Sequence, residues 1–389
     1  MEFGIWNSEF AWDFGFKIES FSPIGMTSTN KPYPKPNYTM PAEWEPHEAV
    51  WLSWPHDPIS FPFLEEAEAE FAAFVAEVST SERVELQVLD DAMQSRVAGL
   101  LRERGVPVGS DAARIRFHCG DYADIWFRDY GPIFVRDSNR AQPGTPSRAT
   151  PLPPLSMIKW IFNAWGGKYA TLLKDDRTPY RMREALRLPM LEPGIVMEGG
   201  SIEVNGKGTL ITTEQCLLNP NRNPTLNKSE IERYLRDYLG VHHFIWLKEG
   251  IEGDDTDGHI DDIARFVNAT TVVCALTSDA SDPDHAPLQK NFELLAAATD
   301  QDGNKLTVIP LPTPGWVGDE EGRLPASYAN FYISNSKVLV PIFGQPNDSK
   351  AVEVIQSLFP GRKTVGLMAK HLVYGLGTFH CMSQQQPSA

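Results

Sequence analysis

The stretch SIEVNGKGTLITTEQCLLNPNRNPTLNKSEIERYLRDYLGVHHFIWL, residues 201–247, decides the fold. Residues 201–204 and 209–213 flank an Asn-Gly-Lys-Gly turn, and this pattern predicts a β-hairpin. A helical pattern follows at 227–239, and an apolar run at 242–247 predicts a third strand. The sequence therefore predicts a β-turn-β-α-β unit.

The same order of elements returns twice downstream. One copy starts at residue 263 and has a helix near 285–299. The next starts at residue 330, with a helix at 349–358 and a last strand at 363–368. The three units start roughly 60–70 residues apart, which indicates stacked supersecondary units.

Two looser copies lie upstream. The nearer one has a first strand at 133–136, and we expect its other elements at 159–165 (strand), 178–187 (helix) and 195–198 (strand). The first copy has a strand at 50–54, and we expect its other elements at 64–79 (helix), 84–89 (strand), 91–104 (helix) and 115–119 (strand). Five similar units predict an α/β protein in which the units close into a ring rather than form separate domains.

The predicted boundaries leave two segments outside the packed units. Residues 1–38 are expected to be a disordered leader or tail, and 39–389 a single catalytic domain. Residues 137–156, rich in Pro, Ser and Thr, are expected to be a low-complexity loop.

Composition narrows the classes of partner and compartment. The chain has 35 Lys and Arg against 51 Asp and Glu, a formal net charge of −16, which argues against nucleic acid as a partner. No apolar run approaches the length of a membrane span. The four cysteines are scattered without a Cys-x-x-Cys pair, which favours reduced thiols and a cytoplasmic location. The oligomeric state is left open, with a homo-oligomer as one option.

The loops that precede the first strands carry polar clusters. If the units pack around an axis, these loops meet at one end of it. The final Gly-rich loop, YGLGTFHC, ends at a cysteine. The polar residues of the clusters are Asp124, Trp126, Arg128, Asp129, Glu198, Asp255, Asp257, His259, Asp261 and Cys381.

A thiol beside Gly-rich backbone and near a histidine indicates a cysteine nucleophile. Its reactive thiolate needs a nearby positive charge, either protonated His259 or a cationic substrate. Converging carboxylates suit a guanidinium, whose planar fork pairs with carboxylates in a bidentate manner. These residues also permit other interpretations. Cys381 can be a buried small apolar residue. Asp254 and Asp262 can be turn formers.

Long motifs then carry a family resemblance. They are MPAEWEPHEAVWLSWP (40–55), IWFRDYGP (125–132), FNAWGGKY (162–169), EGGSIEVNGKGTLITTEQCLLNPNRNP (198–224), GDDTDGHID (253–261), LPASYANFYI (324–333) and GTFHCMSQQQP (377–387). This set resembles the agmatine deiminase family, which includes the bacterial type of peptidylarginine deiminase within the guanidino-group-modifying superfamily.

The resemblance implies a five-bladed α/β propeller and a cofactor-free hydrolase of polyamine metabolism (putrescine biosynthesis). It converts agmatine to N-carbamoylputrescine and ammonia through an amidino-cysteine intermediate. By the same resemblance, Cys381 is the nucleophile and His259 the acid/base. Asp129 and Asp261 grip the guanidinium and Glu198 supports them, while Trp126 and Trp51 line the pocket and no metal is bound.

The sequence departs from the family pattern at two motifs. Many agmatine deiminases have Met-Arg-Asp-Thr-Gly-Pro where this chain has residues 127–132, and Gly-Gly-Gly-Asn-Ile-His where it has 375–380. The substrate is therefore open, and a peptidylarginine or other guanidine deiminase is the nearest alternative. A metal-dependent hydrolase using Asp255, Asp257 and His259, and a non-enzymatic guanidine-binding protein, are more remote alternatives.

Overall fold

In the computed structural model, the stretch that begins at residue 201 forms a three-stranded sheet. Strands β8 (Ile202–Val204) and β9 (Thr209–Thr213) pair antiparallel, and β10 (His243–Leu247) pairs parallel with β9. Helices α6 (Glu214–Leu217) and α7 (Lys228–Leu239) connect β9 to β10. The predicted β-turn-β-α-β order is confirmed for this unit.

Local sequence signals explain where α7 begins and which side it buries. The side chain of Asn227 accepts a hydrogen bond from the backbone N–H of Glu230, whose carboxylate accepts from the backbone N–H of Asn227. This capping box satisfies two N–H groups that have no partner within the helix. Ile231, Leu235 and Leu239 are spaced by four residues and buried, so one apolar stripe packs into the core.

The two following units repeat this topology. In each, the first two strands pair antiparallel and the third pairs parallel with the second. The next unit consists of β11 (Ala264–Asn268), β12 (Thr271–Leu276), α8 (His285–Ala297) and β13 (Thr307–Pro312). The one after it consists of β16 (Tyr332–Ile333), β17 (Lys337–Ile342), α9 (Asp348–Leu358) and β18 (Lys363–Met368). A small hairpin, β14 (Gly318–Asp319) and β15 (Gly322–Arg323), lies between them in sequence.

The unit that contains residues 133–136 has the expected topology with displaced strands. Its sheet has the order β1 (Tyr38–Thr39), β5 (Ile133–Asp137), β6 (Leu155–Ile158) and β7 (Met190–Leu191). Its helical segments are α4 (Ala164–Gly167), η2 (Ala170–Arg177) and α5 (Thr178–Leu186).

Two strand predictions in this unit are wrong. The second strand lies at 155–158 instead of 159–165, because the chain turns at Trp165, whose φ is 52°, a left-handed conformation incompatible with a strand. The third strand was predicted at 195–198, where one isolated bridge joins Ile161 to Val196. The helix predicted at 178–187 is confirmed to within one residue.

The first unit receives one strand from the other end of the described chain. Strands β2 (His47–Ser53), β3 (Arg83–Val88) and β4 (Ile115–Cys119) run parallel, with α1 (Leu64–Val78) and α2 (Asp91–Glu103) between them. Strand β19 (Gln384–Pro387) pairs antiparallel with β2. This strand completes the antiparallel-then-parallel order of the other units.

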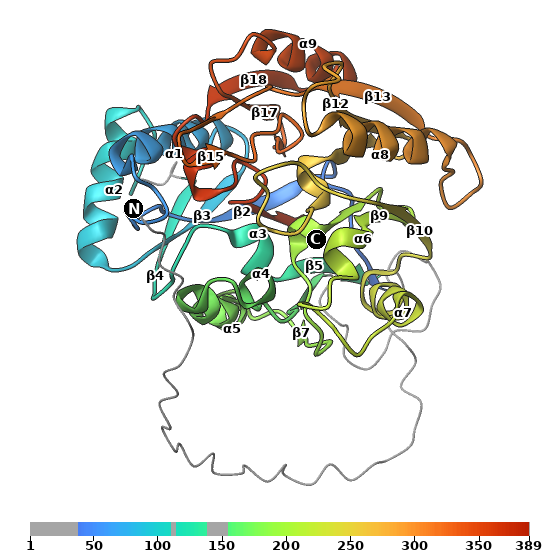
Figure 1. Ribbon diagram of the computed structural model, residues 1–389. Coiled ribbons are helices and arrows are strands. Elements are labelled where there is room, and N and C mark those ends of the chain that lie inside the picture. Colours follow the sequence, from blue (N-terminus) through green and yellow to red (C-terminus); the bar gives the residue numbers. More distant parts are fainter. Residues whose placement is uncertain (1–37, 110–113, 138–154, 389) are drawn as a thin grey trace, which may run out of the picture. The chain divides into compact units, whose positions relative to one another are not determined.

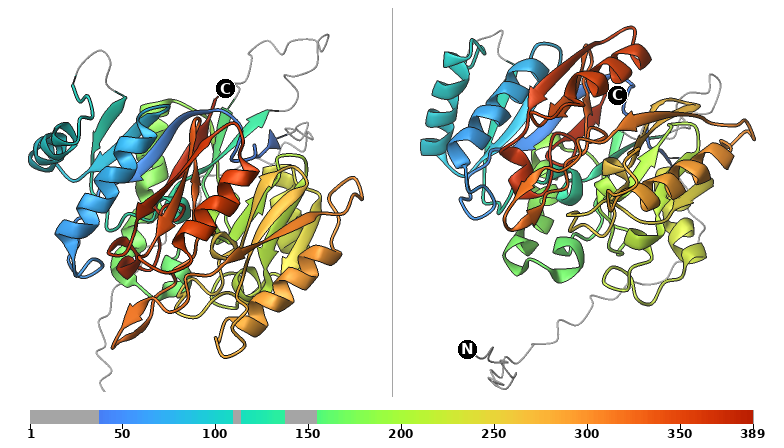
Figure 2. Two further views of the ribbon diagram at one scale, coloured as in Figure 1. Left: turned by 90° about the horizontal axis from the view of Figure 1, so that it is seen from above. Right: turned by 45° about the horizontal axis from the view of Figure 1, so that its top comes forward.

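Contacts between neighbouring units run in a circle. Helix α7 contacts β1 of the preceding sheet, α8 contacts β10, and α9 contacts β13. Helix α1 of the first unit contacts β17 and β18 of the last, and Figures 1 and 2 show these segments side by side. Strand β19 of the first unit contacts β5 of the second, which closes the circle. The predicted α/β class is thus confirmed, and the finer prediction of a propeller is taken up under the proposed function.

The structure describes residues 38–109, 114–137 and 155–388. Apart from their end residues, the predicted leader (1–38) and low-complexity loop (137–156) lie outside these ranges. Among the described helices, none combines the length and apolar character that crossing a bilayer requires.

Candidate active site

Four loops bring the predicted site residues to one place, each just before the first strand of a sheet. They are α3 (Phe127–Tyr130) before β5, η3 (Gly199–Ser201) before β8, η4 (Ile260–Asp262) before β11, and residues 376–383 before β19. Segment η3 contacts both α3 and η4. The convergence predicted from the repeats is therefore present in the structure.

Cys381 lies in the loop before β19, and its side chain is held from two sides. Its Sγ is 2.9 Å from Nδ2 of Asn330 and 3.5 Å from Oδ2 of Asp261. Its backbone carbonyl accepts a hydrogen bond from the N–H of Arg128 in α3. Only 5% of the residue is exposed, so the thiol is shielded from bulk water.

Asp129 projects from α3 and is fixed by two N–H donors. Its Oδ2 accepts from Nε1 of Trp165 at 2.9 Å, and its Oδ1 accepts from the backbone N–H of Gly200 at 3.1 Å. Both oxygens keep lone pairs for a further donor, since each carboxylate oxygen accepts more than one hydrogen bond.

The imidazole of His259 lies beside Asp129 and Asp261 and makes no hydrogen bond to the described residues. Its Nδ1 is 3.8 Å from Oδ1 of Asp129 and 4.0 Å from Oδ1 of Asp261, and neither ring nitrogen has a hydrogen-bond partner among the described residues. A Cβ added to Gly200 would stand 2.6 Å from Nδ1 of His259 and 2.9 Å from Oδ1 of Asp129. Only glycine fits between them, because real Cβ contacts do not come that close.

Asp261 is oriented by the residue that precedes the cysteine. Its Oδ2 lies 2.7 Å from Nδ1 of His380, whose Nε2 lies 2.6 Å from Oε1 of Glu43. Its Oδ1 is buried and has no partner among the described residues. A buried carboxylate oxygen without a partner is costly in a stable fold, and this one is available to a bound cation.

Glu198 stands next to a buried arginine. Its Oε1 accepts from Nε of Arg222 at 2.6 Å, while Oε2 is buried and has no partner among the described residues. The same arginine bonds Oδ2 of Asp257 at 2.7 Å. Arg222 therefore orients Glu198 and leaves one oxygen directed elsewhere.

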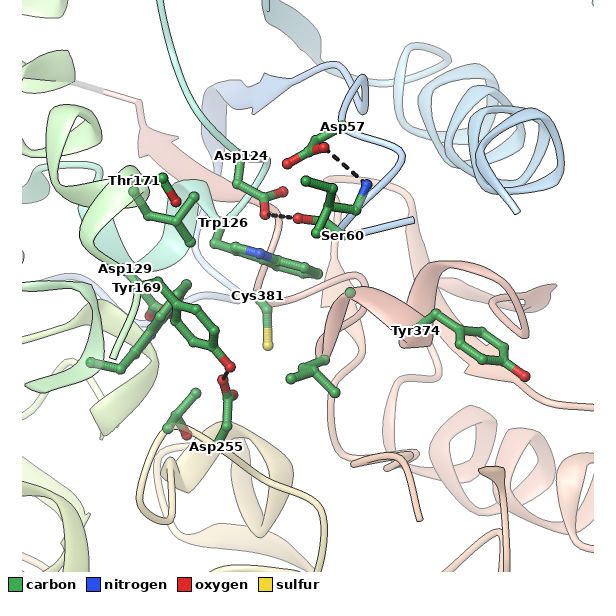
Figure 3. A pocket seen from close by; sticks show the side chains of 16 residues that line it. Asp57, Ser60, Asp124, Trp126, Asp129, Tyr169, Thr171, Asp255, Tyr374 and Cys381 are labelled. Carbon is green, nitrogen blue, oxygen red and sulfur yellow. Dashed lines mark hydrogen bonds between the residues drawn. The ribbon is translucent and has the colours of Figure 1, made fainter. Parts of the chain in front are cut away.

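A cavity of about 370 Å³ opens onto this cluster. Figure 3 shows the sulfur of Cys381 pointing into the cavity beneath the ring of Trp126. Asp124, hydrogen-bonded to Ser60 at 2.7 Å, lies on one wall, and Asp255, hydrogen-bonded to the Tyr169 hydroxyl at 2.5 Å, lies on the other. The lining residues are Asp57, Ile59, Ser60, Asp124, Trp126, Asp129, Trp165, Tyr169, Thr171, Leu172, Asp255, Thr256, Tyr374, Gly375, Leu376 and Cys381.

The two tryptophans predicted to line the pocket occupy different places. Trp126 is a lining residue. Trp51 is not among those that line the described cavity: its indole donates to Gln386 in β19 and packs against Phe127 and His118. Trp51 sits on β2 within the core of the sheet, so its predicted contact with substrate is corrected to packing beneath α3.

Burial controls the protonation of the site. It lowers the pKa of His259 to about 4, although Asp261 and Asp254 oppose this. Burial, followed by the charges of the nearby carboxylates, also raises the pKa of the Cys381 thiol well above its usual range. Without a bound cation, the thiol and the imidazole are therefore both neutral near pH 7.

The carboxylates differ from one another. Burial, then the charges of Asp261 and Glu198, raises the pKa of Asp129 well above its usual range. Burial also raises the pKa of Glu198, although Arg222 partly offsets it. For Asp261 burial acts in the same direction, but the hydrogen bond and charge of His380 outweigh it, and the pKa is lowered.

The alternative metal site is not assembled among the described residues. The Asp255, Asp257 and His259 group is dispersed, because Asp257 pairs with Lys168 and Arg222. Two other buried groups have donor atoms within 4.8 Å of one another, namely Glu198, Cys216 and His259, and Asp261, Asp262 and Cys381. Both overlap the cluster described above.

The sequence interpretation missed three residues that hold this cluster: Trp165, Asn330 and His380. Asn330 occupies, in the unit that starts with β16, the loop position that Asp129, Glu198 and His259 occupy in theirs. The repeat itself was thus a signal that could have identified it. His380 had the weaker signal of directly preceding Cys381.

Comparison with known proteins identifies the family. Residues 39–387 match the Porphyromonas-type peptidyl-arginine deiminase family. The chain belongs to this family. Proteins with similar sequences include the agmatine deiminase of Stutzerimonas stutzeri, which is 36% identical, with 93% of this chain and 98% of that protein covered.

Solved structures of related enzymes have the same fold. The agmatine deiminase of Enterococcus faecalis superposes with a TM-score of 0.80 at 32% identity, covering 90% of this chain and 96% of that one. The putative arginine deiminase of Porphyromonas gingivalis gives 0.79 at 34%, covering 90% and 98%. A C. jejuni agmatine deiminase with substrate bound gives 0.77 at 31%, covering 90% and 96%. By sequence and by fold, this protein is therefore an agmatine deiminase-like enzyme, and its family is one of hydrolases.

Proposed function

We propose that the protein hydrolyses the guanidino group of agmatine to N-carbamoylputrescine and ammonia, with Cys381 as nucleophile. The observation that supports this best is the cavity itself. A thiol and a gripping carboxylate, Asp129, lie at one end, and three further carboxylates, Asp57, Asp124 and Asp255, line the walls. No Lys or Arg is among the described lining residues.

This charge pattern favours agmatine over free arginine. Agmatine carries a guanidinium and a distal ammonium, and acidic walls suit both cations. The carboxylate of arginine would instead be buried among like charges without a cationic partner, which is costly. A nucleophile that is 5% exposed also favours a small molecule, since an arginyl peptide could reach the sulfur only through its side chain, with its backbone held at the mouth of the cavity.

The substrate cation activates the nucleophile in this proposal. The guanidinium binds between Asp129 and Asp261 and supplies the positive charge that neutral His259 does not. The Cys381 proton passes to His259, and the thiolate attacks the guanidinium carbon. His259 returns the proton to the departing nitrogen, so ammonia leaves and an amidino-thioether remains on Cys381.

The second half-reaction uses the same groups. His259 takes a proton from water as the water oxygen attacks the amidino carbon. The C–S bond then breaks, His259 returns its proton to the departing sulfur, and the proton of the new hydroxyl passes to solvent, which leaves the neutral ureido product and the restored thiol. Glu198, oriented by Arg222, supports the positively charged intermediates, and the sequence of steps uses no cofactor.

Three broader proposals accompany this one. The circular contacts between units support a five-bladed α/β propeller, with residues 39–389 forming a single catalytic domain. All four cysteines are unpaired, which supports a reducing, cytoplasmic location. The partner is a small cationic guanidine rather than nucleic acid or membrane.

The test compares substrates that differ in one group. Ammonia release is measured with agmatine, butylguanidine, free arginine and an arginyl peptide. Butylguanidine keeps the guanidinium and chain but lacks the ammonium, so its kcat/KM should be at least about tenfold lower than that of agmatine. Faster turnover of the arginyl peptide than of agmatine would instead assign peptidylarginine deimination.

A pair of variants tests the acidic walls. Asp255→Asn and Asp124→Asn each remove one wall carboxylate, and the variant that loses the ammonium contact should raise KM for agmatine while leaving butylguanidine unchanged. An ammonium site on these walls would be contradicted if both variants changed KM equally for agmatine and butylguanidine. It would also be contradicted if neither variant changed KM for agmatine.

A further inference from the structure

We propose that Asn330 is a positioning residue for the nucleophile: its side-chain amide fixes the loop that carries Cys381 and donates an N–H directly to the sulfur. The inference rests on the proposed function only for the role of Cys381 as nucleophile.

The first support is the location of Asn330 in the repeat. It lies two residues before the short strand β16, as Asp129, Glu198 and His259 stand shortly before the first strands of their own sheets. It is 1% exposed, and it is the contribution of the remaining unit to the cluster. All five units therefore send a polar side chain to the same end of the fold.

The second support is the set of groups that the amide oxygen binds. Oδ1 accepts from the Thr378 hydroxyl at 2.8 Å, the His380 N–H at 3.0 Å and the Cys381 N–H at 3.3 Å. The backbone carbonyl of Asn330 also accepts from the His380 N–H at 3.1 Å. One side chain thus holds the segment that leads into the nucleophile, from Thr378 to the N–H of Cys381 itself.

The third support is that these contacts decide which way the amide faces. Two of the three groups at Oδ1 are backbone N–H donors, which cannot accept a hydrogen bond, so the oxygen must face them. The nitrogen is then forced toward Sγ of Cys381 at 2.9 Å and Oδ1 of Asp262 at 3.0 Å. Its two hydrogens match these two acceptors.

This geometry matters because the sulfur is otherwise surrounded by negative charge. Asp261 and Asp262 of η4 and Asp129 of α3 all face Cys381 and oppose formation of the thiolate. An N–H donor stabilises the anion more than the neutral thiol, so the Asn330 hydrogen bond lowers the pKa of the Cys381 thiol against the effect of burial. A merely structural asparagine would hold the loop without this effect.

The experiment measures the thiol without any substrate. Iodoacetamide alkylation of Cys381 is followed across a pH series by mass spectrometry of the Cys381 peptide, in wild type and in Asn330→Ala. The matched control is Asn291→Ala. Asn291 is also fully buried and also bonds backbone groups through both amide atoms, the Glu249 carbonyl and the Lys248 N–H, but it does not line the cavity.

We expect the alkylation midpoint to rise by about one pH unit in Asn330→Ala, so that below the midpoint the rate falls about tenfold, and to stay at the wild-type value in Asn291→Ala. A wild-type midpoint in folded Asn330→Ala would overturn the proposal. Because agmatine is absent, this result is independent of whether agmatine is the substrate.

A second variant covers the case in which Asn330→Ala fails to fold. Asn330→Asp keeps an oxygen for the Thr378, His380 and Cys381 donors, so the loop retains its anchors. The single proton of a carboxyl cannot serve both Sγ and Asp262, and we expect slower alkylation than wild type at every pH below the midpoint. Alkylation of Asn330→Asp at the wild-type rate would overturn the proposal.

Discussion

Replacing Asp129 by Asn tests the guanidinium grip with little change of shape. In the structure both oxygens of Asp129 face N–H donors, Trp165 Nε1 and the Gly200 backbone. An asparagine has one oxygen, so its NH₂ group must face one of these donors. The variant therefore loses the charge that holds the substrate and one of the two hydrogen bonds that orient the side chain.

The expected magnitude follows from these contacts. A hydrogen bond to a charged group is worth about 1.5–3 kcal/mol, which corresponds to roughly 10- to 150-fold in kcat/KM for agmatine. Because the ureido product is neutral, Asp129→Asn should weaken the binding of agmatine more than the binding of N-carbamoylputrescine. The ratio of their dissociation constants should move toward one.

The assay combines steady-state ammonia release with calorimetric binding in a Cys381→Ala background, where agmatine is not consumed. Burial, followed by the charges of Asp261 and Glu198, raises the pKa of Asp129 well above its usual range, and a bound cation acts in the opposite direction, so agmatine binding should favour loss of a proton from this carboxyl. Measurements in two buffers of different ionisation enthalpy should show fewer protons released on agmatine binding to the Asp129→Asn variant than to the protein with Asp129, since Glu198, whose pKa burial also raises, is present in both.

Asp175→Asn is the matched control. Asp175 is equally buried and also faces two N–H donors, those of Ala123 and Asp124, but it does not line the cavity. Its kcat/KM should stay within about threefold of wild type. If Asp129→Asn turned over agmatine as fast as Asp175→Asn does, the assignment of Asp129 to the grip would be refuted.

The remaining predictions concern the nucleophile, the acid/base, metal dependence and pH. Cys381→Ala should keep the fold and lose at least about a hundredfold in kcat, and a smaller loss would contradict covalent catalysis through this thiol. His259→Ala should be nearly as damaging, because both half-reactions use this side chain. If hydrolysis is the slower half-reaction in this variant, mass spectrometry should detect an amidino adduct on Cys381. Intermediate activity without any adduct would argue against one acid/base shared by both half-reactions. Exhaustive chelation should leave the rate unchanged, whereas activity that is lost and then restored by a divalent ion would support a metal hydrolase. Burial raises the pKa of Asp175 to about 7 from its ordinary 3.8, so the folded state binds this proton more tightly than the unfolded chain. The free energy of unfolding should therefore fall as pH rises between these two values, and Asp175→Asn should flatten this part of the thermal stability profile.

Periodicity predicted the units because hydrophobic patterning and turn residues agree in most of them. The helices at 64–78, 228–239 and 348–358 begin and end within one or two residues of the prediction. The strand predicted through Trp165 was misplaced, because the chain takes a left-handed turn at this residue, whose indole donates a hydrogen bond to Asp129. Local pattern does not record a tertiary requirement of this kind.

The site was predictable to the extent that its residues share a position in the repeat. Cys381, His259, Asp129, Asp261 and Glu198 are brought together in the structure, while their chemical roles stay predictions. Trp51 was misplaced because an aromatic residue on a buried strand and one on a pocket wall look alike in sequence. His380 and Asn330 act through hydrogen bonds to residues far away in the chain, and spacing along the sequence does not reveal such contacts.

The pairing of β19 with β2 has a consequence for how the enzyme folds during its synthesis. Residues 384–387 must find a partner at 47–53, so this sheet depends on a contact between segments far apart in the chain. Contacts of such long range are slow to form, because bringing the two distant segments together costs loop-closure entropy before the contact stabilises anything. The ribosome makes β2 early and the loop with Cys381 late. The active-site cluster around Cys381 is therefore not assembled until β19 has paired with β2. We therefore expect activity to appear in one late step of folding, after most of the secondary structure has already formed.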